Sequence, residues 1–92
     1  MPDVVDNVAA HRLEIADGGE IAFLKYRANG DVIEYLHSET PPALQGRGYA
    51  GALAKFALDR DKAAGRTVVP TCPFVKTYIQ RHPEYASLVH AG

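Results

Sequence analysis

Leu44-Gln45-Gly46-Arg47-Gly48-Tyr49-Ala50 places two glycines around an arginine, immediately before a run of small and apolar residues from Gly51 to Ala64. Glycine adopts backbone conformations that other residues avoid, so this stretch predicts a tight turn that leads directly into a helix. The first amides of a helix have no acceptor within the helix, and the helix dipole makes this end positive. Because neither glycine has a Cβ, an anion can approach these amides closely. The stretch therefore predicts a pyrophosphate site formed by backbone groups.

The same stretch differs from two better-known phosphate loops. It lacks the Lys-Ser or Lys-Thr pair of a nucleoside-triphosphate P-loop, and it lacks the third glycine and the acidic residue of a dinucleotide-binding fold. What remains is the pattern Gln-x-x-Gly-x-Ala, formed by Gln45, Gly48 and Ala50. This pattern resembles the pyrophosphate loop of the GNAT acetyltransferase superfamily, which binds coenzyme A. An ordinary turn from loop to helix is the alternative.

Composition indicates one globular domain. The chain has 92 residues, of which 47% are hydrophobic and 23% charged, with a net charge of −1. These values suit a small soluble domain and favour neither nucleic acid nor an anionic membrane as a partner. The single cysteine, Cys72, excludes an internal disulfide and a four-cysteine zinc site. The N-terminus has no apolar run typical of a signal peptide. We therefore expect a cytoplasmic protein without a metal, with a loosely held arm over residues 1–10 and one domain over 11–92.

Alternation of polar and apolar residues predicts three antiparallel strands in the first half of the chain. They cover 11–16, 20–28 and 32–38. Asp17-Gly18-Gly19 forms the first turn, and Asn29-Gly30 is a strong hairpin signal because both residues tolerate positive φ.

The second half predicts a helix over 48–64, a strand over 67–72 and helices over 74–81 and 85–90. Pro70 places the strand at an edge of the sheet. A crossover helix joins parallel neighbours, so the strands before and after it should be parallel, with their carboxyl ends together. The predicted fold class is therefore α/β with a mixed sheet. The apolar stripe of the long helix is expected to comprise Tyr49, Leu53, Phe56 and Ala57.

Three blocks carry a closer resemblance. The first is a His-x-Glu-x-Pro-Pro-x-Leu-x-Gly-x-Gly string from His37 to Gly48, and the second is the helix with Leu53 and Ala57. The third is Val69-Pro70-Thr71-Cys72-Pro73-Phe74-Val75, followed by Tyr78 and His82-Pro83-Glu84-Tyr85. In order and spacing these blocks resemble the minimal, single-domain YjdJ-like branch of the GNAT N-acetyltransferase superfamily. Thr40 departs from the family, which often has valine there.

The resemblance implies a GNAT-like fold with three antiparallel strands, a helix, a parallel strand and C-terminal helices. It implies acetyl-CoA as co-substrate, a pantetheine arm on the backbone of the strand end, and two splayed parallel strands with the thioester between them. Arg47 either adds charge near the phosphates or points to solvent. The residues expected to bind the coenzyme are Glu39, Thr40, Gln45, Gly46, Arg47, Gly48, Tyr49 and Ala50.

Four side chains are candidates for catalysis. His37 can take the proton from an ammonium substrate, and Glu39, on the same strand face, is the alternative base. Cys72 is expected to face one cleft with His37. It would act as an acetyl acceptor or as a proton-handling group beside the coenzyme sulfur, or it is a small buried hydrophobe. The resemblance implies that Tyr78 protonates the departing thiolate, although a tyrosine on an amphipathic helix is commonly a core residue.

The predicted function is transfer of acetyl from acetyl-CoA to a primary amine whose identity the sequence does not name. The amine must lose a proton to His37, Glu39 or a water, while backbone N–H groups near Thr40 polarise the carbonyl. Two alternatives stay open. One is a non-catalytic module that binds coenzyme A or acyl-CoA, because the short chain lacks the helices that larger GNAT enzymes place over the acceptor site. The other is an interaction domain that keeps only the fold.

Overall fold

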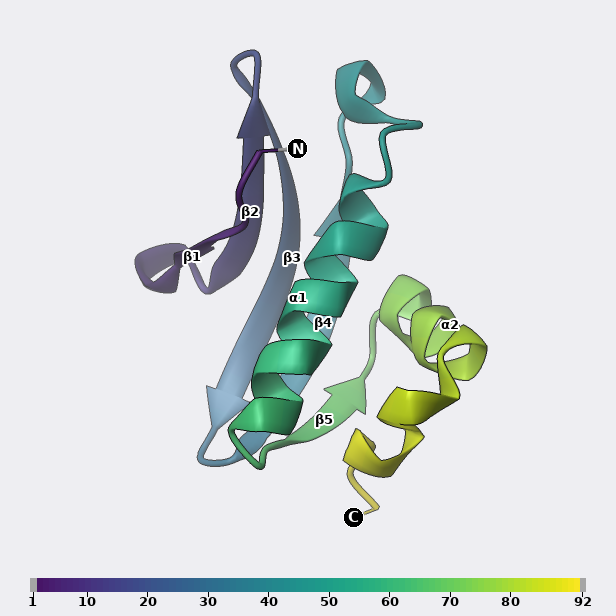
Figure 1. Cartoon of the computed structure of the whole chain (residues 1–92). Helices are drawn as coiled ribbons and strands as arrows, with labels where there is room; N and C mark the ends of the chain where they lie inside the picture. Colours follow the sequence, from purple (N-terminus) through teal and green to yellow (C-terminus); the bar gives the residue numbers. More distant parts are fainter. Residues whose placement is uncertain (1, 92) are drawn as a thin grey trace.

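The computed structural model describes residues 2–91, in which helices pack on a five-stranded sheet. The strands follow one another across the sheet in chain order, and only β4 and β5 are parallel (Figure 1). The predicted fold class, with its antiparallel meander and parallel fifth strand, is confirmed. The strands are β1 (Val5–Asn7), β2 (Arg12–Asp17), β3 (Glu20–Asn29), β4 (Val32–Glu39) and β5 (Thr67–Pro70). The α-helices are α1 (Tyr49–Ala63) and α2 (Pro73–Arg81), and the 3₁₀ helices are η1 (Val8–Ala10), η2 (Pro42–Leu44) and η3 (Pro83–Leu88).

The N-terminal segment differs from the expected loose arm. Val5 lies opposite Glu14 in an antiparallel pairing of β1 with β2. The carboxylate of Asp6 accepts hydrogen bonds from the Tyr26 hydroxyl at 2.7 Å and from Arg60 at 3.1 Å. These partners lie far away in the sequence, so the local polar composition of the first ten residues did not indicate the strand. Met1 lies outside the described residues.

The predicted alternation along β3 is confirmed. Ala22, Leu24 and Tyr26 are buried, whereas Lys25 and Arg27 on the opposite face are exposed. Helix α1 lies across the buried face, with α2 and η3 beside it (Figure 1). Both helices therefore contribute to one core that lies on a single side of the sheet.

Helix α1 buries a stripe that differs from the predicted one at a single position. Phe56 is 40% exposed, so its assignment to the core is wrong. The buried positions define one side of the helix, and Phe56 lies at the border of that side. They are Tyr49, Leu53, Ala54, Ala57, Leu58 and Asp61.

A carboxylate is buried at the carboxyl end of α1. Asp61 is fully buried and accepts a hydrogen bond from the Tyr35 hydroxyl of β4. Guanidinium nitrogens of Arg60 and Arg66 lie 3.7 and 3.6 Å from its Oδ1 atom. Burial raises the pKa of Asp61 above its ordinary value, and the Tyr35 hydroxyl and the two arginines act in the opposite direction. This cluster ties α1 to β4 on the sheet.

We expect Asp61→Ala to destabilise the fold by roughly 3–5 kcal/mol, because it leaves the Tyr35 hydroxyl buried without its acceptor and Arg60 without part of its counter-charge. Urea unfolding followed by circular dichroism measures the change. Lys55→Ala is the control on the same helix, since it removes only the exposed Lys55–Asp59 pair of 2.7 Å and should leave the unfolding midpoint almost unchanged. A midpoint for Asp61→Ala that matches the control would contradict the structural role of the buried carboxylate.

Candidate functional site

The loop between η2 and α1 has the backbone geometry that its glycines predict. Gly46 and Gly48 have φ angles of +82° and +78°, in the left-handed region that side chains disfavour. A Cβ built on either glycine would meet nothing within 4 Å, so space for a ligand is open beside the backbone. The glycines are needed for the turn itself, and they also leave the start of α1 accessible.

The first turn of α1 offers free backbone donors. Gly48 caps the helix without a side chain, and the first helical bond runs from Ala52 N–H to the Gly48 carbonyl at 3.0 Å. The amides before Ala52 have no acceptor in the helix. They border a cleft of about 240 Å³, which we call the glycine cleft. Its lining residues are Thr40, Leu44, Gln45, Gly46, Gly48, Tyr49, Ala50, Gly51 and Phe74. This arrangement of donors at the positive end of a helix suits an anion.

The loop is fixed by polar contacts on both sides. Gln45 donates its side-chain amide to the Thr40 carbonyl at 3.1 Å. On the other side, Asp17 at the end of β2 accepts hydrogen bonds from Arg47 at 2.8 Å and from the Tyr49 hydroxyl at 2.6 Å. The contact with Asp17 raises the pKa of Tyr49 above its ordinary value. The sequence indicates Asp17 only as a turn residue, because nothing local connects it with a loop about thirty positions away.

The parallel pairing of β4 and β5 stops before the end of β4, and we call the unpaired stretch beyond Tyr35 the opening. Pairing between β4 and β5 covers only Val32 to Tyr35 of β4, after which Cys72 N–H donates to the Tyr35 carbonyl at 2.7 Å. β4 then continues to Glu39, paired with β3 alone among the described residues. The expected splay is therefore present. It leaves the backbone of the last four residues of β4 without a strand on the β5 side.

A β-bulge interrupts β4 beside this opening. Tyr26 of β3 lies opposite Tyr35, but Lys25 lies opposite His37, so Leu36 is an extra residue. The extra residue reverses the alternation that follows. Ser38 consequently shares the face of the buried Leu24, whereas His37 and Glu39 lie on the opposite face.

The predicted acid–base residues are brought together only in part. His37 and Glu39 lie side by side as predicted, with Nε2 and Oε1 3.8 Å apart and side chains that are 60% and 63% exposed. The ring of His37 meets Phe23 edge to face, with centroids 6.1 Å apart. The expectation that His37 and Cys72 share a cleft is wrong, because the bulge places His37 on the other face of the sheet.

Cys72 instead meets Ser38, a residue that sequence reasoning missed. The thiol donates to the Ser38 hydroxyl, with Sγ and Oγ 3.6 Å apart. Only 2% of Cys72 is exposed, so the thiol lies in the core beside the opening. A serine in a strand gives no signal of such a contact, because the contact depends on the bulge.

Tyr78 lies on α2 next to the start of α1. Its ring stacks on His82 with a centroid distance of 4.0 Å, and the ring comes within 4.0 Å of a Cβ built on Gly51. Burial raises the pKa of Tyr78 above its ordinary value. The residue is partly buried against the core, which agrees with its packing interpretation, and its proton-transfer role stays a prediction.

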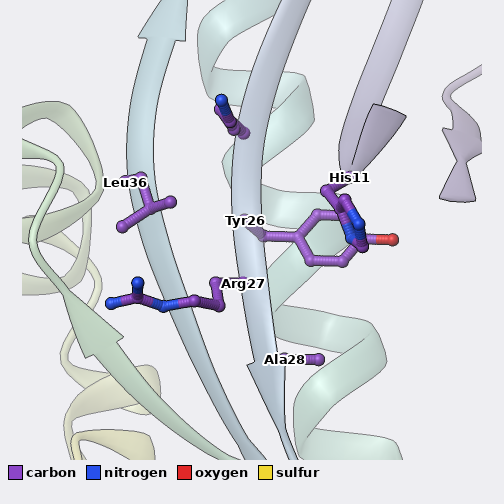
Figure 2. Close-up of a pocket in the computed structure, with 6 residues that line it drawn as sticks. His11, Tyr26, Arg27, Ala28 and Leu36 are labelled. Atoms are coloured by element: carbon purple, nitrogen blue, oxygen red, sulfur yellow. The ribbon is translucent and has the colours of Figure 1, made fainter. Parts of the chain in front are cut away.

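A second hollow of about 260 Å³ lies along β3 and is distinct from the glycine cleft. Figure 2 shows Tyr26 beside His11 on one side of β3. On the other side, Arg27 is directed toward β4, where Leu36 lies. The His11 and Tyr26 rings meet edge to face at 6.2 Å. Because none of the predicted site residues lines this hollow, we assign it no part in the chemistry.

Within residues 2–91, no helix combines the length and apolar character needed to cross a membrane. The same part of the chain holds no group of three or more His, Cys, Asp or Glu placed to bind a metal ion. A family model described as GCN5-related N-acetyl-transferase matches residues 12–88, which include the glycine cleft, both faces of β4 and helix α2.

Proposed function

Since the chain belongs to the GCN5-related N-acetyltransferase family, we propose that it transfers acetyl from acetyl-CoA to a primary amine. The observation that carries this proposal is the cleft of about 240 Å³ at the start of α1, where two glycines expose backbone amides beside the open edge of β4. The amides of Tyr49, Ala50 and Gly51 would hold the pyrophosphate of the coenzyme.

The open edge of β4 supports the placement of the pantetheine arm. The backbone groups from Leu36 to Glu39 have no strand partner on the β5 side in the described part of the chain, and an unpaired strand edge offers N–H and C=O groups to an extended ligand. The amides of the arm would bind those groups along β4 and near Thr40. This path leads from the glycine cleft to the opening beside Ser38 and Cys72, where the thioester would lie.

The two faces of β4 would have different roles, one binding the amine and its base and the other the thioester. The amine approaches on the face of His37 and Glu39, and one of these groups or a water takes its proton. The nitrogen then forms a bond to the thioester carbon, while backbone N–H groups near Thr40 stabilise the oxyanion. The carbon–sulfur bond breaks, and the thiolate leaves and is protonated, with Tyr78 as the candidate donor.

Burial of Cys72 favours direct transfer over a covalent acetyl-cysteine. A thiol that is only 2% exposed and packed in the core is poorly placed to attack a thioester and to pass its acetyl group on. We expect Cys72→Ala to keep most of the turnover in a steady-state assay, provided that its melting temperature shows a folded protein. Mass-spectrometric detection of an acetyl group on Cys72 that passes to the amine would overturn direct transfer.

Arg47 is expected to contribute little to coenzyme binding, because Asp17 holds its guanidinium in an exposed ion pair of 2.8 Å. Arg47→Ala should therefore change the dissociation constant of coenzyme A, measured by calorimetry, by no more than about fivefold. A loss of a hundredfold would instead place the guanidinium on the phosphates in the complex.

The proposed activity is tested with acetyl-CoA carrying an isotopic label in the acetyl group. The purified protein is incubated with this donor and a fractionated cell extract, and mass spectrometry follows labelled N-acetyl products. Products that require the folded protein support the proposal. Coenzyme binding without any product would indicate a binding module, and the absence of binding would indicate an interaction domain.

A further inference from the structure

Three aromatic rings follow one another along one side of α2. Phe74 and Tyr78 are four residues apart and lie on one face of the helix, and His82, the cap residue just after the helix, continues the series. The Phe74 and Tyr78 rings are stacked, with centroids 6.4 Å apart and planes inclined by 30°. Tyr78 and His82 stack at 4.0 Å with an angle of 17°. Phe74 is the ring of this series nearest the amino end of α2.

The Phe74 end of the series borders the glycine cleft. Phe74 lines the cleft together with the first turn of α1, and the residue is 41% exposed. Tyr78 is the next ring of the series and itself packs near Gly51. An exposed aromatic ring at the end of a series of rings therefore stands next to the backbone amides that suit an anion.

We propose that Phe74 is the surface on which the adenine base of coenzyme A stacks. This assignment rests on the proposed function. The base is flat and has a π-face, so it can extend a series of stacked rings. The pantetheine arm is not planar and carries amides, which suit the open backbone of β4. The two arms of the coenzyme thus leave the cleft in different directions.

The consequence is selection of the donor. Both coenzyme A and a carrier-protein thioester present a phosphopantetheine arm, but only coenzyme A carries adenine. A platform for the base favours free acetyl-CoA over the same arm on a carrier protein.

The test compares two ligands on two proteins by calorimetry. Phe74→Ala should weaken binding of coenzyme A about tenfold or more, the value of one base–aromatic stack. The same change should leave binding of 4′-phosphopantetheine, which lacks the base, unaltered. Phe74→Leu keeps apolar bulk but not the flat ring and should behave like Phe74→Ala, whereas Phe74→Trp should retain coenzyme A binding.

Phe56→Ala is the matched control, because Phe56 is 40% exposed on the neighbouring helix and does not line the cleft. It should leave both affinities unchanged. An equal loss for both ligands in Phe74→Ala would show that the ring contacts the pantetheine arm, and full retention of coenzyme A binding would show no contact. Either result overturns the assignment to adenine. A wild-type protein that binds neither ligand would instead overturn the proposed function.

Discussion

Gly48→Glu is expected to abolish binding of coenzyme A. Gly48 precedes α1 with a φ angle of +78°, and a side chain there would project into open space beside the first-turn amides. The carboxylate would occupy the region proposed for the pyrophosphate and repel it. Repulsion between like charges costs several kcal/mol at an interface, so we expect a loss of about a hundredfold or more in affinity. Calorimetry with coenzyme A measures it.

Two controls separate charge from backbone strain. Gly65 has a φ angle of +70° just beyond the carboxyl end of the same helix, so Gly65→Glu introduces comparable strain and the same charge away from the cleft. Gly48→Ala introduces strain at the same position without charge. Both variants should bind coenzyme A measurably, and tight binding by Gly48→Glu would place the pyrophosphate elsewhere.

The second large effect is expected from the residues on the helix-free face of β4. His37→Ala or Glu39→Gln should lower turnover by ~10²–10⁴-fold, the usual contribution of a general base. Their affinity for acetyl-CoA should change little, because both side chains are exposed on the face opposite Ser38 and Cys72. Steady-state kinetics with the acceptor amine, combined with calorimetry for the donor, measures the two quantities separately.

Asp31→Asn provides the comparison for this pair, since Asp31 is an exposed carboxylate in the turn before β4, at the end of the strand away from His37 and Glu39. It should leave turnover unchanged. Full activity in both the His37 and the Glu39 variant would exclude them as the base and leave a water, or the substrate's own ionisation, in that role.

Local sequence patterns predicted most of the elements because the responsible interactions are local. The Asn29-Gly30 turn joins β3 and β4 as expected, and Gly46 and Gly48 take the positive φ angles that the loop requires. Alternation along β3 separates buried from exposed residues correctly. Pro70 ends the edge strand β5, two residues before the predicted end.

The features that escaped prediction depend on contacts between distant residues. Asp17, which lies beside the turn between β2 and β3, accepts hydrogen bonds from Arg47 and Tyr49 at the start of α1. β1 forms because β2 pairs with it and because Arg60 and Tyr26 bind Asp6. Hydrophobic periodicity carries no information about such partners. The candidate site was therefore predictable as a loop and a strand, but the relative placement of its side chains was not.

The bulge at Leu36 makes the pairing of β4 a constraint separate from its composition. Odd-numbered side chains such as Tyr35 face the helices before it, and the even-numbered Ser38 does so after it. Regular pairing of all eight residues, without the bulge, would turn Ser38 outward and His37 inward, while every residue type stayed the same. A change that draws Leu36 into the regular pairing would therefore invert the site, whereas deletion of Leu36 would remove the bulge and keep Ser38 and His37 on their present sides.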